Sequence, residues 1–210
     1  MRRKLTALVI PALLLLALPA AAPKDSQTAL RDSMRKLWSD HVSWTRMFII
    51  SAVHGLPDKD ATTQRLLRNQ DDIGAAVGQF YGKAAGDRTA ALLRDHILIA
   101  ADLVGAAKAG DKATVDQLNA KWRGNADDIA TFLSTANPKH WPKETLRSML
   151  HKHLEQTLAE ATHRIQGNYA ADAKDYDEAL DHMLMVADAL SDGIIHQFPQ
   201  KFSGKKTAAR

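Results

Sequence analysis

The feature that most constrains this chain is a set of polar residues that recur at fixed spacing inside stretches with the apolar periodicity of helices. Residues 95–102 and 181–188 both read D-H-x-L-x-x-A-D, residues 69–73 and 125–129 both read N-x-D-D-I, and residues 41–45 and 153–157 both read H-x-x-x-T. Burying such groups costs free energy unless each finds a partner. The repeats therefore predict either a mutually satisfied polar layer or a ligand site.

The positions of the prolines and the amino-acid composition predict an all-helical fold. No proline lies between Pro57 and Pro138 or between Pro142 and Pro199, and the Ala, Leu, Lys, Arg and Gln content favours helix over sheet. Capping residues and breakers delimit six helices. Their expected ranges are 28–53, 60–81, 87–109, 111–136, 143–166 and 169–198.

The spacing of the repeats predicts how these helices pair. His41 precedes Asn69 by nearly the same distance that separates His96 from Asn125, which makes the first four helices two copies of one hairpin. His153 and His182 share this spacing, so the last two helices fit a third hairpin, although residues 181–188 also echo the third helix. Short connections make successive helices antiparallel neighbours. We expect a six-helix bundle built from repeated antiparallel α-hairpins.

Several polar side chains fall on the apolar stripes of their own helices, near mid-helix. Neutral imidazole and carboxylate suit a transition-metal ion, and bundle interiors often hold such sites. The candidate metal ligands are His41, His96, His153, His182, Asp72 and Asp128, with Asn69, Asn125, Thr45, Thr157 and Glu160 as candidate partners in a polar network. The alternative is a core hydrogen-bond network without a ligand.

The two ends of the chain differ from the body. Residues 1–22 have the basic start, apolar run and small residues of an export signal, with cleavage expected after Ala20, Ala21 or Ala22. Residues 23–200 form the expected single helical domain, and residues 201–210 a basic disordered tail. Removing the three basic residues of the signal takes the net charge from +4 to +1, and removing the four of the tail takes it to −3. We expect a periplasmic or secreted protein that has no transmembrane segment once the signal is cleaved.

Composition and motifs restrict the function. The chain has no cysteine, which excludes a lipoprotein anchor, disulfides, thiol catalysis and cysteine-ligated metal. No basic face favours nucleic acid. No nucleophile elbow or phosphate-binding glycine loop is present, and the lone Glu160-x-x-His163 falls short of a ferritin-like di-iron site. An enzyme is therefore the less favoured interpretation, and no catalytic residue is assigned.

Five segments resemble a family of exported, all-helical bacterial proteins of uncertain function, some of which are named glycosyltransferases. These segments are residues 38–46, 68–74, 95–102, 125–129 and 197–202. The resemblance implies an extracytoplasmic helical domain. Residues 172–175 do not supply the D-x-D motif of a nucleotide-sugar transferase. We expect a non-catalytic binding protein whose central His/Asp/Asn layer holds a transition-metal ion; the alternative is a structural protein, or one that binds an envelope partner.

Overall fold

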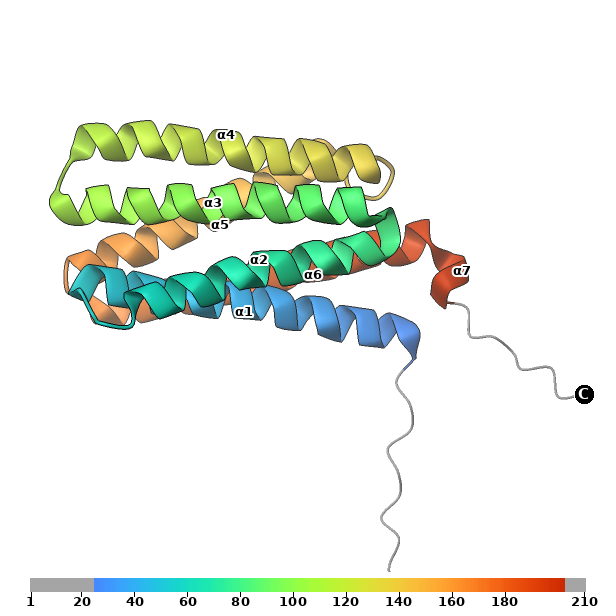
Figure 1. Cartoon of the computed structure of the whole chain (residues 1–210), viewed down its shortest axis with the longest axis horizontal. Helices are drawn as coiled ribbons and strands as arrows, with labels where there is room; N and C mark the ends of the chain where they lie inside the picture. Colours follow the sequence, from blue (N-terminus) through green and yellow to red (C-terminus); the bar gives the residue numbers. More distant parts are fainter. Residues whose placement is uncertain (1–24, 203–210) are drawn as a thin grey trace, which may run out of the picture.

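The computed structural model describes residues 25–202, and these residues form helices without a strand, which confirms the all-α fold (Figure 1). The helices are α1 (Ser26–His54), α2 (Lys59–Tyr81), α3 (Lys83–Ala109), α4 (Lys112–Ala136), α5 (Lys143–Ile165), α6 (Tyr169–Gln197) and α7 (Pro199–Phe202). The six long helices are the expected ones. The short α7 was not expected, because Pro199 reads as a helix stop, yet proline is well tolerated in a first helical turn.

Local sequence explains where the helices begin and end. Asp25 accepts hydrogen bonds from the free N–H groups of the first turn of α1, and Gly55 ends that helix in the left-handed conformation at φ 63°. The prediction that the third helix starts near Asp87 is wrong, because the chain turns at Gly82 instead. Gly86 lies inside α3 against Gly74 of α2, where a Cβ on either residue would approach the other's carbonyl oxygen to 2.6 Å. These glycines therefore allow α2 and α3 to pack closely.

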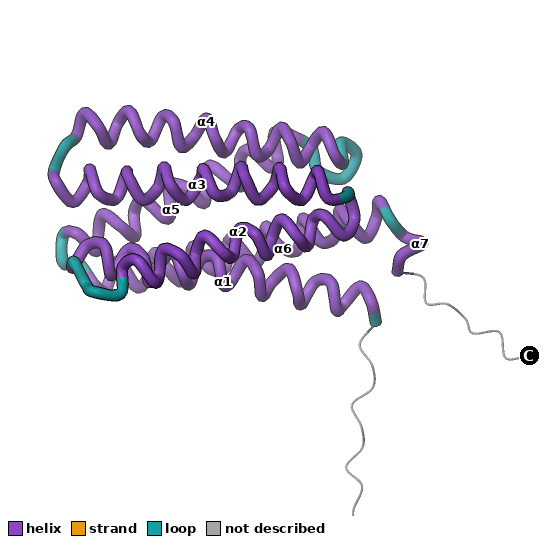
Figure 2. The backbone as a smooth tube through the Cα atoms, viewed as in Figure 1, coloured by secondary structure: helices purple, strands orange, loops and turns teal. Residues whose placement is uncertain are grey.

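The long helices form a closed ring in which each packs on the next and α6 returns to α1. Figures 1 and 2 show the three hairpins lying alongside one another, with short loops at both ends of the bundle. Because neighbours are antiparallel, α1, α3 and α5 run in the same direction. These three helices also contact one another across the ring, so their facing sides line its centre.

The three hairpins repeat one hydrogen bond between their two helices. Asn69 Nδ2 donates to Leu37 O at 3.0 Å, and Asn125 Nδ2 donates to Leu92 O at 3.1 Å. In the third hairpin His182 Nε2 lies 2.8 Å from Met149 O. Each of these carbonyls lies four residues before His41, His96 or His153. His182 therefore takes the place of the two asparagines, and the echo between residues 95–102 and 181–188 does not mark equivalent positions.

The sides of the helices that face the ring centre bury an apolar core that includes Trp38 and Trp122, and Trp141 joins this core from the connection between α4 and α5. Across residues 25–202, every helix is too short or too polar to cross a membrane. The expected export signal and its cleavage residues lie outside the described residues, as does all of the basic tail beyond Phe202.

Candidate functional site

Three of the four candidate histidines meet at the centre of the ring. His41 of α1, His96 of α3 and His153 of α5 are 2%, 3% and 4% exposed. His41 Nε2 lies 3.4 Å from His153 Nε2, and the rings of His96 and His153 stack with centroids 6.2 Å apart. We call these three residues the histidine layer. They meet because they occupy the same position in three hairpins whose first helices run in parallel.

Burial keeps the histidine layer neutral. Desolvation disfavours a charged imidazolium, and it lowers the pKa of His41 to about 3 and that of His96 to about 4. Burial, together with the neighbouring imidazoles, also holds the pKa of His153 well below its usual range. Each ring therefore carries a single N–H at neutral pH and keeps one nitrogen lone pair, which is the form that binds metal ions.

Hydrogen bonds indicate which nitrogen of His41 and His153 carries the proton. Gln70 Nε2 donates to Leu66 O and lies 3.4 Å from His41 Nδ1. An amide nitrogen can only donate, so His41 Nδ1 accepts and its proton sits on Nε2. That N–H points at His153 Nε2, which leaves the proton of His153 on Nδ1, 3.5 Å from the hydroxyl oxygen of Thr157.

His96 has the tightest contact of the histidine layer. Asn125 Nδ2 donates to Leu92 O, so its Oδ1 faces His96 Nδ1 at 2.8 Å and accepts the proton of that nitrogen. His96 Nε2 is then left with a lone pair. A histidine that ligates a metal usually donates its other ring N–H to an oxygen in this way, which fixes the tautomer and the ring orientation.

Several buried polar atoms around the histidine layer lack a hydrogen-bond partner in the described part of the chain. They include the indole Nε1 atoms of Trp38 and Trp122 and the amide Oε1 of Gln70. Trp38 packs edge-on to His41, and Trp122 packs against His96 with ring centroids 5.1 Å apart. An unpaired buried polar group costs about 1–3 kcal/mol, so the layer is incompletely satisfied as it stands.

Within the described residues, the other candidate ligands make no hydrogen bond to a ring nitrogen of the histidine layer. His182 is half-buried, and its Nε2 lies within hydrogen-bond distance of Met149 O. Asp72 is half-buried on α2, and Asp128 is exposed on α4, where it lines an open groove with Asp95 and Asp102. Neither aspartate hydrogen-bonds to a histidine of the layer. The polar centre is thus made of imidazole, amide and hydroxyl groups, without a carboxylate.

Some of the candidate network partners contact the histidine layer directly, and others do not. Asn125 and Thr157 contact histidines of the layer, whereas Asn69 contacts Gln70 and reaches His41 only through it. Thr45 donates its hydroxyl proton to His41 O of its own helix. Gln70 is a contact that the sequence analysis missed, although it directly follows Asn69 in the repeated segment and is fully buried.

Glu160 belongs to a second buried polar cluster, near the turn between α5 and α6. Arg46 Nη1 donates to Glu160 Oε1 and to Asp172 Oδ1, both at 2.9 Å, and Arg164 Nη1 donates to Asp172 Oδ2 at 3.1 Å. We call these four residues the charged cluster. Arg46 also lies over the ring of Tyr176. Both carboxylates that Arg46 contacts come from the third hairpin, Glu160 from α5 and Asp172 from α6.

The carboxylates of the charged cluster are almost completely buried, with Glu160 2% and Asp172 1% exposed. Burial raises the pKa of Glu160 to about 7, although the nearby Arg46 acts in the opposite direction. Asp172 receives two hydrogen bonds from Arg46 and one from Arg164. These bonds are made within the cluster, so its carboxylates are paired with guanidinium groups, while Arg164 Nε is buried without a hydrogen-bond partner in the described residues.

As the side chains stand, residues 25–202 contain no group of three or more His, Asp or Glu residues in the geometry of metal ligands. The pair His41–His153 does have the spacing of two ligands on one ion. For a metal–nitrogen distance of 2.0–2.1 Å and tetrahedral angles, two imidazole nitrogens lie about 3.3–3.4 Å apart. The 3.4 Å between the two Nε2 atoms fits this spacing, whereas it exceeds the usual hydrogen-bond length.

The chain matches no protein-family model, no curated protein and no solved structure. The resemblance drawn from five sequence segments therefore stays a prediction. Any functional conclusion for this protein depends on the chemistry of its own residues.

Proposed function

We propose that this protein is an exported, non-catalytic helical protein that binds one transition-metal ion between His41, His96 and His153. The ligand atoms are the three Nε2 nitrogens, with a solvent molecule or another small ligand as the fourth donor. This narrows the candidate ligands to the three histidines that meet, and it omits His182, Asp72 and Asp128.

The observation that carries the proposal is the common arrangement of the three rings. Each imidazole has a polar partner at Nδ1, namely Gln70, Asn125 or Thr157. Two of the Nε2 atoms already have the spacing of ligands on one tetrahedral ion. Support from outer partners at one ring nitrogen, with the other nitrogen left for the ion, is the usual design of histidine metal sites.

Metal binding requires two local changes. The ring of His96, now stacked on His153, has to bring its Nε2 to the ion. The proton on His41 Nε2 has to move to Nδ1, where Gln70 would need to present its Oε1 instead of its Nε2. That oxygen is buried and has no hydrogen-bond partner in the described chain, so it is free to accept.

The donor set favours particular ions. Three neutral imidazoles without a carboxylate or thiolate suit zinc, copper, iron or nickel better than magnesium or calcium, which prefer oxygen ligands. The low pKa values of His41 and His96 keep these rings available at neutral pH, so protons compete little with the ion.

A second function is favoured by one observation, the directional chain of contacts from Gln70 through His41 and His153 to Thr157. It assigns a role to each of those ring nitrogens without an ion. In that case the histidine layer fixes how three helices pack, and the protein is a structural component or binds an envelope partner. All three contacts of this chain are 3.4–3.5 Å long, which is weak for hydrogen bonds that would fix helix packing.

The test is metal analysis of natively purified mature protein, followed by reloading with Zn²⁺ and Co²⁺ and by thermal melting. We expect one ion per chain, a raised melting temperature, and loss of both in each of His41→Gln, His96→Gln and His153→Gln. His182→Gln is the matched control, because it removes a helix-bound imidazole outside the layer and should retain the ion.

Gln70→Glu separates the two functions even if the histidine variants fold poorly. A carboxylate beside His41 Nδ1 favours the tautomer that a metal needs, so the variant should bind Zn²⁺ more tightly than the wild type while being less stable without it. Wild-type protein that cannot be loaded, together with Gln70→Glu that is only less stable, would overturn the metal proposal and favour the structural alternative.

A further inference from the structure

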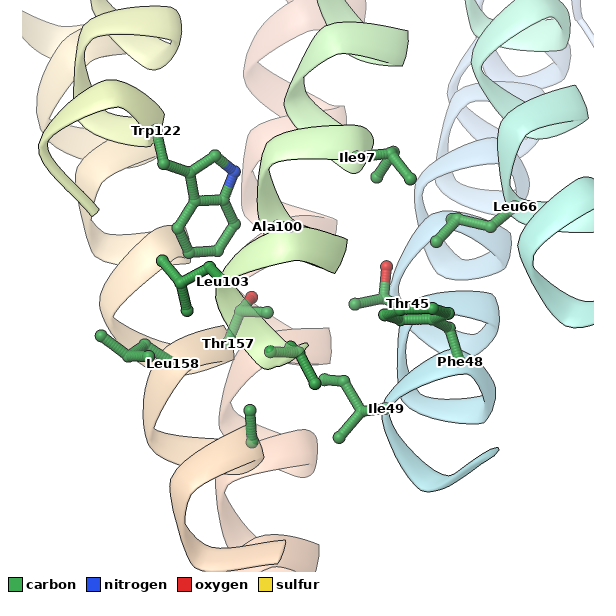
Figure 3. A pocket seen from close by; sticks show the side chains of 12 residues that line it. Thr45, Phe48, Ile49, Leu66, Ile97, Ala100, Leu103, Trp122, Thr157 and Leu158 are labelled. Atoms are coloured by element: carbon green, nitrogen blue, oxygen red, sulfur yellow. The ribbon is translucent and has the colours of Figure 1, made fainter. Parts of the chain in front are cut away.

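An apolar cavity lies one helical turn from the histidine layer, on the same axis of the ring. The residues four positions after the three histidines are Thr45, Ala100 and Thr157, and all three line this cavity (Figure 3). Because α1, α3 and α5 run in the same direction, these residues form the next level of the bundle. The second hairpin has alanine, Ala100, where the first and third have threonine. The smaller side chain of Ala100 leaves space one helical turn from the imidazoles.

The cavity is small and apolar. The volume open to the centre of a water-sized sphere is about 20 Å³, slightly more than the roughly 10–15 Å³ that one water needs. Its remaining walls come from apolar side chains, including Phe48, Ile49 and Leu103. A buried water needs two to four polar partners, and cavities lined by aliphatic side chains stay dry and take up apolar guests instead.

The polar atoms at the wall are few and mostly engaged. The hydroxyls of Thr45 and Thr157 donate to carbonyls of their own helices, His41 O and His153 O. Trp122 also lines the cavity, and its indole N–H has no partner in the described chain. A guest would thus meet aliphatic and aromatic walls and at most one unsatisfied donor, which suits a molecule with little polarity and a weak acceptor atom.

We propose that this cavity is a binding site for a neutral, apolar guest of diatomic size, of which dioxygen and carbon monoxide are examples. The site consists of chain residues alone and does not depend on the proposed metal. If an ion is bound by the histidine layer, the guest lies next to it, on the side of the ring where α1, α3 and α5 continue toward their C-terminal ends.

The test uses xenon and dioxygen on metal-free protein with labelled methyl groups. We expect saturable xenon-induced shifts of the Ile49, Ile97 and Leu103 methyls, and paramagnetic broadening of the same signals under dioxygen pressure. Ala100→Ile fills the space and should abolish both effects. A melting temperature measured for the same variant shows that it remains folded, and Ala100→Val serves as a smaller substitution if isoleucine does not fit.

A second apolar cavity of similar size, lined by residues that include Val77, Thr89 and Leu93, provides the matched control. Thr89→Ile should leave the shifts at Ile49 and Leu103 unchanged. Xenon shifts confined to this second cavity, or shifts at Ile49 that persist in Ala100→Ile, would overturn the proposal. Because the protein is metal-free throughout, failure of the metal proposal leaves this result intact, and failure here leaves the metal experiments unaffected.

Discussion

The histidine layer and the charged cluster bury ionisable groups in opposite ways. In the histidine layer the rings lose their charge, since desolvation lowers the pKa values of His41 and His96 to about 3 and 4. In the charged cluster Asp172 is matched by Arg46 and Arg164 through contacts of 2.9–3.2 Å. The neutral rings keep nitrogen lone pairs that can bind a metal ion, whereas the carboxylates of the charged cluster are paired with guanidinium groups. Within the cluster the unpaired buried atom is a donor, Arg164 Nε. Burial of polar residues thus indicates a metal site only where acceptor lone pairs remain.

The largest effect is expected from breaking the charged cluster. Asp172→Asn leaves two partly buried guanidinium groups without their shared carboxylate, and such a change lowers the free energy of unfolding by about 3–5 kcal/mol. Asp188→Asn, which removes the partner of Arg35 on the surface, should cost about 0–1 kcal/mol. Urea unfolding measures both. Equal costs for the two variants would show that the cluster is not a buried structural unit.

The two asparagines at equivalent hairpin positions test the outer partners of the histidine layer. Asn125 contacts His96, whereas Asn69 reaches His41 only through Gln70. Asn125→Ala should weaken Zn²⁺ binding by about 10–100-fold, and Asn69→Ala should weaken it less at a similar cost in stability. Calorimetric titration with Zn²⁺ decides this, and an identical affinity in both variants would contradict the role given to Asn125.

The pH dependence of stability should have opposite signs in the two regions. The pKa of His96 is lowered in the folded state, so below about pH 6.5 the unfolded state binds more protons than the folded state. The stability that neutral His96 contributes is therefore lost as the pH falls toward 4. The pKa of Glu160 is raised in the folded state, so between about pH 4.5 and 7 the folded state binds more protons than the unfolded state. The stability that protonated Glu160 contributes is therefore lost as the pH rises.

Each group therefore changes the slope of unfolding free energy against pH by about 1 kcal/mol per pH unit between pH 5 and 6. In urea unfolding, His96→Gln should make the slope less positive and Glu160→Gln should make it more positive. Slopes that move in the same direction in the two variants would be inconsistent with this account.

The smallest effects are expected from the candidate ligands that lie outside the histidine layer. Asp72→Asn and Asp128→Asn should leave Zn²⁺ affinity unchanged within a factor of about two and stability within about 0.5 kcal/mol. The same titrations and unfolding curves measure this. Loss of metal in Asp128→Asn would instead connect the groove on α3 and α4 with metal binding.

The sequence was sufficient to predict the six long helices, apart from the start of the third, and the hairpin repeat, because caps, breakers and a three- to four-residue period are local signals. It also placed His41, His96 and His153 on apolar stripes, and these residues do meet. It did not separate them from Asp72 and Asp128, since residues three apart on a helix point in related directions and the width of the buried face depends on neighbouring helices.

Two features were not given by local motifs, one inside the third hairpin and one at the closure of the ring. His182 shares a motif with His96 but occupies the position of Asn125, which only the spacing from His153 indicates. The charged cluster joins Arg46 to residues more than a hundred positions later, because α6 packs against α1. An arginine directly after Thr45 on a buried face was the only sequence signal for it.

The central claim is that each imidazole of the histidine layer is neutral and that its Nε2 is the atom that would bind a shared ion. Long-range proton–nitrogen correlation spectra of the histidine side chains test it most directly. At pH 7 the account predicts the proton on Nδ1 in His96 and His153 and on Nε2 in His41, and Zn²⁺ should then shift all three Nε2 signals and move the His41 proton to Nδ1. A protonated imidazolium at neutral pH, or Zn²⁺ that leaves these three nitrogens unshifted, would contradict it.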